Sequence, residues 1–354
     1  MKANDEIQSG CFESVDICPL CDSEDSETLF ANFDRLYYLP GEFTTLRCAD
    51  CGLIRISPRP TRLEMSNYYP ETYSAYRNPA TIHTLAKYDA PGIKSFIRQS
   101  ILGELGYFES RRTLVNQLVG KILKPWFFER ATFGYEHRFP QWTENGHALE
   151  IGCGNGFFLT FLKELGWEVQ GVDLSDHAAA AARALGIDVF VGDILEAPLA
   201  AASFDFVRMS HVLEHTFDPL ATMKRVRQFI KPTSQVYVEV PNAAGAGAII
   251  SGKYWFGWDA PRHLYMFTLE TLSRLLVEAG FRIDRIETKP WDSFEWALNW
   301  ESEEHSGSRI KDRPRIGKDQ ESRVRTLRRE ADNLYRQDPT KGDLIRCWAS
   351  DSGD

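Results

Sequence analysis

Short apolar segments alternate with helical segments from Ala148 to about residue 290, and this alternation most restricts the fold. The apolar segments are HALEIG (147–152), EVQGVD (168–173), VFVGD (189–193), FDFVRMS (204–210), QVYVEV (235–240) and FRIDRIE (281–287). The helices between them are expected at Phe157–Leu165, Asp176–Leu185, Pro219–Phe229 and Leu269–Ala279. Strands that alternate with helices form a mainly parallel sheet with helices on both faces. The sequence therefore predicts an α/β fold.

Two of these helices have clear end signals. Asp218 is a good N-cap for a helix whose first residue is Pro219, because proline lacks the N–H that this position leaves unpaired. Thr268 caps the next helix, and Gly280 suits its C-terminal end.

A glycine-rich turn follows the first strand. Gly152, Gly154 and Gly156 let the backbone turn tightly and approach a ligand closely, since no Cβ intervenes. The helix that follows presents free N–H groups and the positive end of its dipole. Asp173 ends the second strand, where a carboxylate can accept both hydroxyls of a ribose. These residues predict a nucleoside site.

The spacing of the glycines separates two classes of nucleoside ligand. The nicotinamide-dinucleotide fingerprint is Gly-x-Gly-x-x-Gly, and its third glycine allows close packing of helix on strand. Here Phe157 occupies that position, and a bulky ring fits it poorly. Gly-x-Gly-x-Gly with Glu150 two residues before it instead resembles motif I of class I methyltransferases. The resemblance implies a Rossmann-like fold and S-adenosyl-L-methionine (SAM) as methyl donor.

Further segments resemble the same family in the expected order. Asp193 stands where the family places an acidic residue beside adenine, and Ser203–His215 resembles the family's fourth strand and following loop. Trp258–Thr268 is similar to a segment of bacterial methyltransferases from sugar and surface-polysaccharide pathways, which suggests carbohydrate biosynthesis. The resemblance covers about residues 15 to 290.

The family pattern implies a role for each matching residue. Glu150 would orient the loop and the amino group of the methionine moiety. The three glycines would line the donor, Asp173 would bind the ribose and Asp193 would contact adenine. Leu174 and Ile194 would sandwich the adenine ring, although both are also suited to simple core packing.

Four of the seven cysteines form two Cys-x-x-Cys pairs, Cys18/Cys21 and Cys48/Cys51. Two such knuckles give a closed tetrahedral four-sulfur site for structural Zn²⁺, with no position open for water. A redox Cys-x-x-Cys would not be doubled. The arrangement resembles the N-terminal zinc-binding domain of a group of sugar C-methyltransferases. Cys11, Cys153 and Cys347 are expected to be free thiols.

Histidine is the usual base near neutral pH, and methylation of a hydroxyl or a carbon acid requires removal of a proton. His211 and His215 follow the fourth strand, at the edge of the sheet where open α/β folds bind ligands. His215 is the first candidate for the general base, His263 is the second, and His211 lies nearer the donor. Each is equally compatible with a structural role.

The chain divides into four predicted regions. Residues 1–60 form the zinc module, and 61–145 form an aromatic, helical connector or lid that includes Tyr68, Tyr69, Tyr73 and Tyr76. Residues 146–290 form the SAM-binding domain, with FRIDRIE as its last clear strand. Residues 291–354 form a charged, partly disordered extension, in which WDSFEWALNW is a candidate strand and Arg323–Arg329 a solvated helix.

Charge and composition limit the classes of partner that the chain can bind. The net charge of −9 disfavours a protein that holds nucleic acid through bulk electrostatics. No apolar run reaches the roughly 20 residues of a membrane span, and the N-terminus lacks the features of a secretory signal, which favours the cytoplasm.

We expect a methyltransferase that acts on oxygen or carbon of a small, sugar-containing metabolite. An RNA methyltransferase and a non-catalytic zinc interaction module are the alternatives. The sequence leaves the oligomeric state open.

Overall fold

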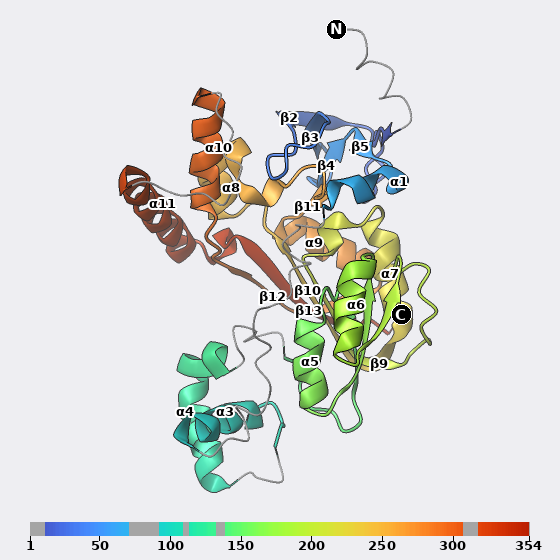
Figure 1. Cartoon of the computed structure of the whole chain (residues 1–354), viewed down its shortest axis with the longest axis vertical. Helices are drawn as coiled ribbons and strands as arrows, with labels where there is room; N and C mark the ends of the chain where they lie inside the picture. Colours follow the sequence, from blue (N-terminus) through green and yellow to red (C-terminus); the bar gives the residue numbers. More distant parts are fainter. Residues whose placement is uncertain (1–10, 71–91, 109–112, 132–138, 307–317, 354) are drawn as a thin grey trace.

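The computed structural model describes residues 11–70, 92–108, 113–131, 139–306 and 318–353. A seven-stranded sheet lies at the centre of the molecule, and a four-stranded sheet lies beyond the carboxyl ends of its parallel strands (Figure 1). The order of the large sheet is β12-β13-β10-β9-β6-β7-β8. Its strands are β6 (His147–Ile151), β7 (Glu168–Asp173), β8 (Asp188–Val191), β9 (Phe204–Ser210), β10 (Ile230–Pro241), β12 (Phe281–Lys289) and β13 (Leu344–Asp351).

All six predicted strands and the four helices between them are present. The helices are α5 (Phe157–Glu164), α6 (Asp176–Ala184), α7 (Pro219–Phe229) and α9 (Leu269–Glu278). The side chain of Asp218 accepts the N–H of Ala221, and Thr268 forms a capping box with Thr271. The pairs β10–β9, β9–β6, β6–β7 and β7–β8 are parallel, so their carboxyl ends meet at one edge of the sheet. We call this the carboxyl edge.

The C-terminal region differs from its prediction as a polar extension. Leu344–Asp351 form β13, which pairs antiparallel with β10 on one side and with β12 on the other. Ile345, Cys347 and Ala349 are fully buried there. The candidate strand in WDSFEWALNW is instead part of α10 (Phe294–Ser306), while the basic patch lies in α11 (Lys318–Gln337), a helix as predicted.

The N-terminal cysteine region shares a sheet with the large domain. Strands β2 (Ser26–Asn32), β3 (Phe43–Cys48) and β4 (Ile54–Ser57) are extended by β11 (Tyr265–Met266), which comes from the segment before α9. The short β1 (Phe12–Glu13) pairs with β5 (Arg59–Pro60). Side chains of both parts form one continuous core. The two parts therefore pack as one body.

The connector between them divides into two parts. The short α1 (Arg62–Met65) and the 3-10 turn Ser66–Tyr68 lie next to the carboxyl edge. Helices α3 (Ile93–Gly103) and α4 (Leu114–Ala131) lie at the opposite end of the molecule (Figure 1). There Tyr107, after α3, accepts a hydrogen bond from Trp167 at the start of β7. The α3–α4 pair therefore does not cover the glycine loop; Tyr73 and Tyr76 lie outside the described residues.

The remaining described elements are short. They are the 3-10 turns Leu213–His215, Gly252–Tyr254, Phe256–Trp258 and Pro339–Lys341, and helix α8 (Ala246–Ser251). Among the residues that the structure describes, no helix is both long and apolar enough to span a bilayer.

Candidate functional site

The glycine loop joins β6 to α5. Gly152, Gly154 and Gly156 all have positive φ, at 68°, 54° and 73°, a region in which L side chains are strained. A Cβ added to Gly152 would lie 2.3 Å from a methyl carbon of Val212, in the loop after β9. The loop is therefore shaped by its glycines, and it touches the segment that contains the candidate histidines.

Asp173 lies at the carboxyl end of β7 and organises the loop. Its carboxylate accepts the N–H of Gly154 at 2.8 Å and the N–H of Ser175 at 2.8 Å, one on each oxygen. Burial raises the pKa of this carboxyl group, and these N–H donors oppose the rise. Each carboxylate oxygen has a second lone pair, so both can still accept a ribose hydroxyl.

Leu174 is 74% exposed, which removes core packing as the explanation for this residue. A large apolar side chain is therefore exposed directly after β7. Ile194 is buried and belongs to the main core. Asp193 accepts the N–H of Leu195 and forms an ion pair with Arg62 at 2.7 Å, so any adenine contact would share this carboxylate with Arg62.

Glu150 is buried at the end of β6 and forms a short ion pair with Arg208 of β9. Its Oε2 is buried with no hydrogen-bond partner. A buried acceptor without a partner is costly, and an ammonium group would satisfy it. The residues of this cradle thus fit SAM in two respects: Asp173 offers an acceptor for the ribose, and Glu150 offers an acceptor without a partner for the amino group.

His211 is the most accessible of the three candidate histidines, with 40% of its side chain exposed. Its Nδ1 lies 3.3 Å from an oxygen of Glu214, and its Nε2 lies 3.7 Å from an oxygen of Glu239. Its φ of +56° is unusual for a non-glycine residue. Such outliers collect at functional sites because the surroundings must hold them in place.

His215 and His263 lie together behind His211, with ring centroids 4.6 Å apart. Nδ1 of His215 lies 2.9 Å from the carbonyl oxygen of Arg262 and 3.0 Å from the hydroxyl of Tyr69. Burial, with a further contribution from His263, lowers the pKa of His215 to about 4, so the ring is neutral at pH 7. Tyr69 is the predicted lid residue that reaches a candidate histidine.

Sequence reasoning assigned no role to Glu214, yet this residue is central to the cluster. Its side chain is fully buried, and it accepts a hydrogen bond from His211. Burial raises the pKa of Glu214, but His211 and the other two histidines outweigh that effect and lower it. Arg262 and Asp34 were also missed, and they form a fully buried ion pair at 2.7 Å. The histidines next to Glu214 in the sequence could have indicated a functional role for it. The residues around Asp34 give no such indication.

The four paired cysteines converge as predicted. The sulfurs of Cys18 and Cys51 lie 3.5 Å apart, those of Cys21 and Cys48 lie 3.4 Å apart, and all four fall within 4.8 Å of one another. A tetrahedron of sulfurs about 2.3 Å from a zinc ion has edges of similar length. Burial raises the pKa of the Cys48 thiol, but the N–H groups of Cys51 and Asp50 lower it to about 6. Cys11, Cys153 and Cys347 are free thiols, as expected.

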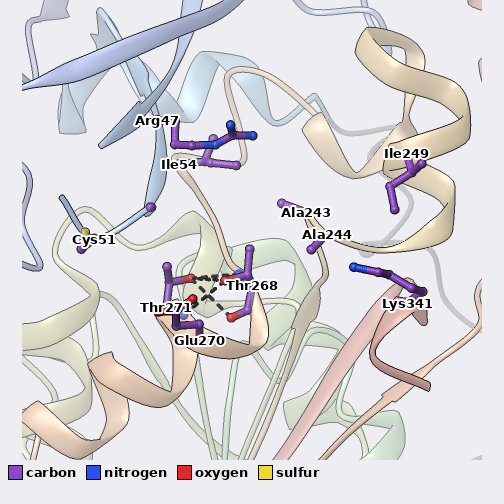
Figure 2. A pocket seen from close by; sticks show the side chains of 11 residues that line it. Arg47, Cys51, Ile54, Ala243, Ala244, Ile249, Thr268, Glu270, Thr271 and Lys341 are labelled. Carbon is purple, nitrogen blue, oxygen red and sulfur yellow. Dashed lines mark hydrogen bonds between the residues drawn. The ribbon is translucent and has the colours of Figure 1, made fainter. Parts of the chain in front are cut away.

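A separate cavity of about 400 Å³ lies between the second cysteine knuckle and the segments that follow β10 and β11 (Figure 2). Its lining combines two cations, Arg47 and Lys341, with Glu270 and the capping threonines of α9. Cys51 is at its edge. Neither the predicted donor residues nor the candidate histidines line this cavity.

The fold and the site define a nucleoside-binding α/β domain of the Rossmann type. Residues 129–286 match the family described as "Methyltransferase domain". The chain is 26% identical over 184 residues to a ubiquinone biosynthesis O-methyltransferase of Parvibaculum lavamentivorans, which covers 48% of this chain and 72% of that protein. It is 26% identical over 165 residues to a probable SAM-dependent methyltransferase of Mycobacterium tuberculosis, which covers 45% of this chain and 57% of that protein.

A solved structure, a SAM-dependent methyltransferase from Archaeoglobus fulgidus, aligns with 65% of this chain and 93% of its own, at 23% identity and a TM-score of 0.42. The chain contains a methyltransferase domain at residues 129–286, and its enzyme class is that of a SAM-dependent methyltransferase. SAM is the methyl donor.

Proposed function

We propose that the chain transfers the methyl group of SAM to an oxygen atom of a small molecule, with His211 as general base. The observation that carries this proposal is the contact between Val212 and Gly152, which sets the residue beside His211 against the donor loop. Methyl transfer from a sulfonium is an in-line displacement. The protein must therefore align the acceptor with the donor and remove one proton.

The geometry favours His211 over His215 and His263 as the base. His211 is half-exposed and so can meet an acceptor, whereas His263 is buried. Burial lowers the pKa of His215 to about 4, so this ring is a weak base at pH 7. Buried Glu214 and Glu239 beside the ring would stabilise the imidazolium that forms when His211 takes the proton. They would also fix its orientation.

The donor is assigned to the cradle at the carboxyl edge. Gly152, Gly154 and Gly156 would line it, and Glu150 would accept its amino group. Asp173 would accept the ribose hydroxyls. Exposed Leu174 would cover one adenine face, while Ile194 supports the floor below and Asp193 reaches the adenine edge.

Oxygen is favoured over carbon as the acceptor because a relative that matches over 184 residues is an O-methyltransferase. Carbon methylation would require a ketone beside the acceptor atom and a base that generates an enolate. A sugar hydroxyl remains within the proposal, as one class of small-molecule hydroxyl. The cysteine cluster is assigned a structural Zn²⁺ held by Cys18, Cys21, Cys48 and Cys51.

Two other functions are less well supported. An RNA methyltransferase would need a basic stripe with stacking aromatics, and the net charge of −9 opposes one. A non-catalytic zinc interaction module would not need the orphan acceptor of Glu150 or the strained His211.

The test is methyl transfer from isotope-labelled SAM to a panel of phenols, nucleotide-linked sugars and RNA, with the label located by mass spectrometry. We expect label on a small-molecule oxygen. His211→Ala should lower kcat by roughly 10²- to 10⁴-fold, the usual contribution of a general base, without changing SAM affinity. His177→Ala, an exposed histidine on α6, is the matched control. Label on RNA or on carbon, or full activity of His211→Ala, would contradict the proposal.

A further inference from the structure

Glu214, His215 and His263 bring one ligand atom each into a space in which all three lie within 4.8 Å of one another. The first two follow β9, and the third comes from the segment before β11. We propose that these residues bind a divalent first-row transition metal ion, at a second metal site distinct from the four cysteines.

The two histidine rings are held in the orientation that metal ligation requires. Nδ1 of His215 lies 2.9 Å from the carbonyl oxygen of Arg262, and Nδ1 of His263 lies 2.7 Å from that of Gly257. A carbonyl oxygen can only accept, so each Nδ1 bears the proton and each Nε2 keeps its lone pair. Metal-ligating histidines almost always donate their other N–H in this way, which fixes the tautomer and the ring.

One oxygen of the Glu214 carboxylate, Oε2, has no partner. The side chain is fully buried, and the other oxygen accepts a hydrogen bond from His211. A buried carboxylate is stable only when it is paired or coordinates a metal. The nearby cation, Arg262, already pairs with Asp34 at 2.7 Å and with Asp259 at 2.6 Å. A cation bound by Glu214, His215 and His263 would give this unpartnered oxygen a partner.

The ligand set points to the class of metal. Two imidazoles and one carboxylate suit Fe²⁺, Co²⁺, Mn²⁺, Ni²⁺ or Zn²⁺, whereas Mg²⁺ and Ca²⁺ prefer all-oxygen sites. Three protein ligands leave at least one coordination position open to water or to a substrate oxygen. The four cysteines offer no such position.

A catalytic consequence follows if the chain methylates oxygen, and this step alone rests on the proposed function. A hydroxyl that occupies the open position becomes more acidic, because the metal ion stabilises its conjugate base. The proton would then pass to His211, and the oxygen lone pair would attack the methyl carbon as the carbon–sulfur bond breaks. S-adenosylhomocysteine is the leaving group.

The experiment is a Co²⁺ titration of the full chain after its cysteine site has been filled with one Zn²⁺ per chain. Calorimetry and visible absorption report binding, and the intense thiolate-to-cobalt band reveals any exchange into the cysteine site. We expect one Co²⁺ per chain to bind without that band. His263→Ala and the isosteric Glu214→Gln should each weaken binding at least about 10-fold, while His177→Ala should bind as the wild type does.

The proposal would be overturned if the wild type bound no Co²⁺, or if Co²⁺ only displaced zinc from the cysteine site. It would also be overturned if both variants bound Co²⁺ as tightly as the wild type does. The wild-type stoichiometry decides the matter even if a variant fails to fold. SAM affinity, measured on the same protein without Co²⁺, separates the two ideas: SAM binding and methyl transfer without a cobalt site would refute the metal and leave the O-methyltransferase intact.

Discussion

Asp173 holds the donor loop, and it is also the proposed acceptor for the ribose of the donor. Its two oxygens hold the N–H groups of Gly154 and Ser175, and so fix the turn that approaches the ligand. The spare lone pairs of the same oxygens are the proposed acceptors for the ribose hydroxyls. One side chain therefore couples the shape of the cradle to the recognition of the sugar.

We expect Asp173→Ala to reduce SAM affinity on the order of 100-fold or more, because hydrogen bonds to a charged group contribute about 1.5–3 kcal/mol each. Calorimetry with SAM measures this loss. Zinc content should stay at one ion per chain, which shows that the protein is folded. Asp176→Ala removes an exposed carboxylate from the same helix region and should bind SAM normally. Micromolar affinity of Asp173→Ala for SAM would contradict the assignment of Asp173 to the ribose.

Asp343 gives the protein a pH-dependent stability. The residue is 2% exposed and accepts the N–H groups of Gly247 and Trp291. Burial raises its pKa to about 6, although these donors oppose the rise. Because the folded pKa exceeds the unfolded value near 4, the native state is favoured at low pH and loses this contribution as pH rises through about 6.

The stability of the wild type relative to Asp343→Asn should therefore fall by as much as about 3 kcal/mol between about pH 4 and pH 6. Urea unfolding at several pH values measures this difference. Asp332→Asn, which removes an exposed carboxylate of α11, controls for the change in net charge. A constant difference between wild type and Asp343→Asn across this range would refute the prediction.

At the scale of elements, the sequence predicted those strands and helices that have a local pattern of their own. It missed the strand that depends on pairing with its neighbours. The strands and helices from β6 to β12 were predictable because each has its own periodicity and end signals. β13 was not, since LIRCWASD mixes charged and small residues, and only its two neighbours make it a strand. The glycine loop and the place of Asp173 beside it were predictable from spacing, whereas the burial of Glu214 became evident only in the fold.

The position of β13 makes the C-terminus essential to the sheet. Its residues pair with both β10 and β12, so removing it would expose two strand edges and a buried apolar stripe. A chain that ends at Gly342 should lose cooperative thermal unfolding and SAM binding, as measured by circular dichroism and calorimetry. A chain that ends at Ser352 keeps β13 and is the control. Cooperative unfolding of the shorter chain would show that the sheet closes without β13.

At the scale of the whole molecule, the cysteine module and the methyltransferase domain are joined by more than a linker. They share the β11–β4 pairing and one apolar core, and the fully buried pair of Asp34 and Arg262 crosses the junction. Arg262 also donates to the carbonyl of Tyr68, and its own carbonyl orients His215. The module therefore supports the histidine cluster from outside the domain.

The last prediction concerns this junction. Asp34→Ala should cost about 3–5 kcal/mol of unfolding free energy, the usual penalty for removing one partner of a buried ion pair. Asp259 still faces Arg262, which places the expected loss at the lower end of that range. Calorimetry of Asp34→Ala should show one unfolding transition at a lower temperature, because module and domain unfold together. The control is Asp25→Ala, which changes an exposed residue of the same module and should leave the unfolding temperature unchanged. Two separated transitions in the wild type would mean that the module folds independently, and that the shared sheet contributes little to holding the histidines in place.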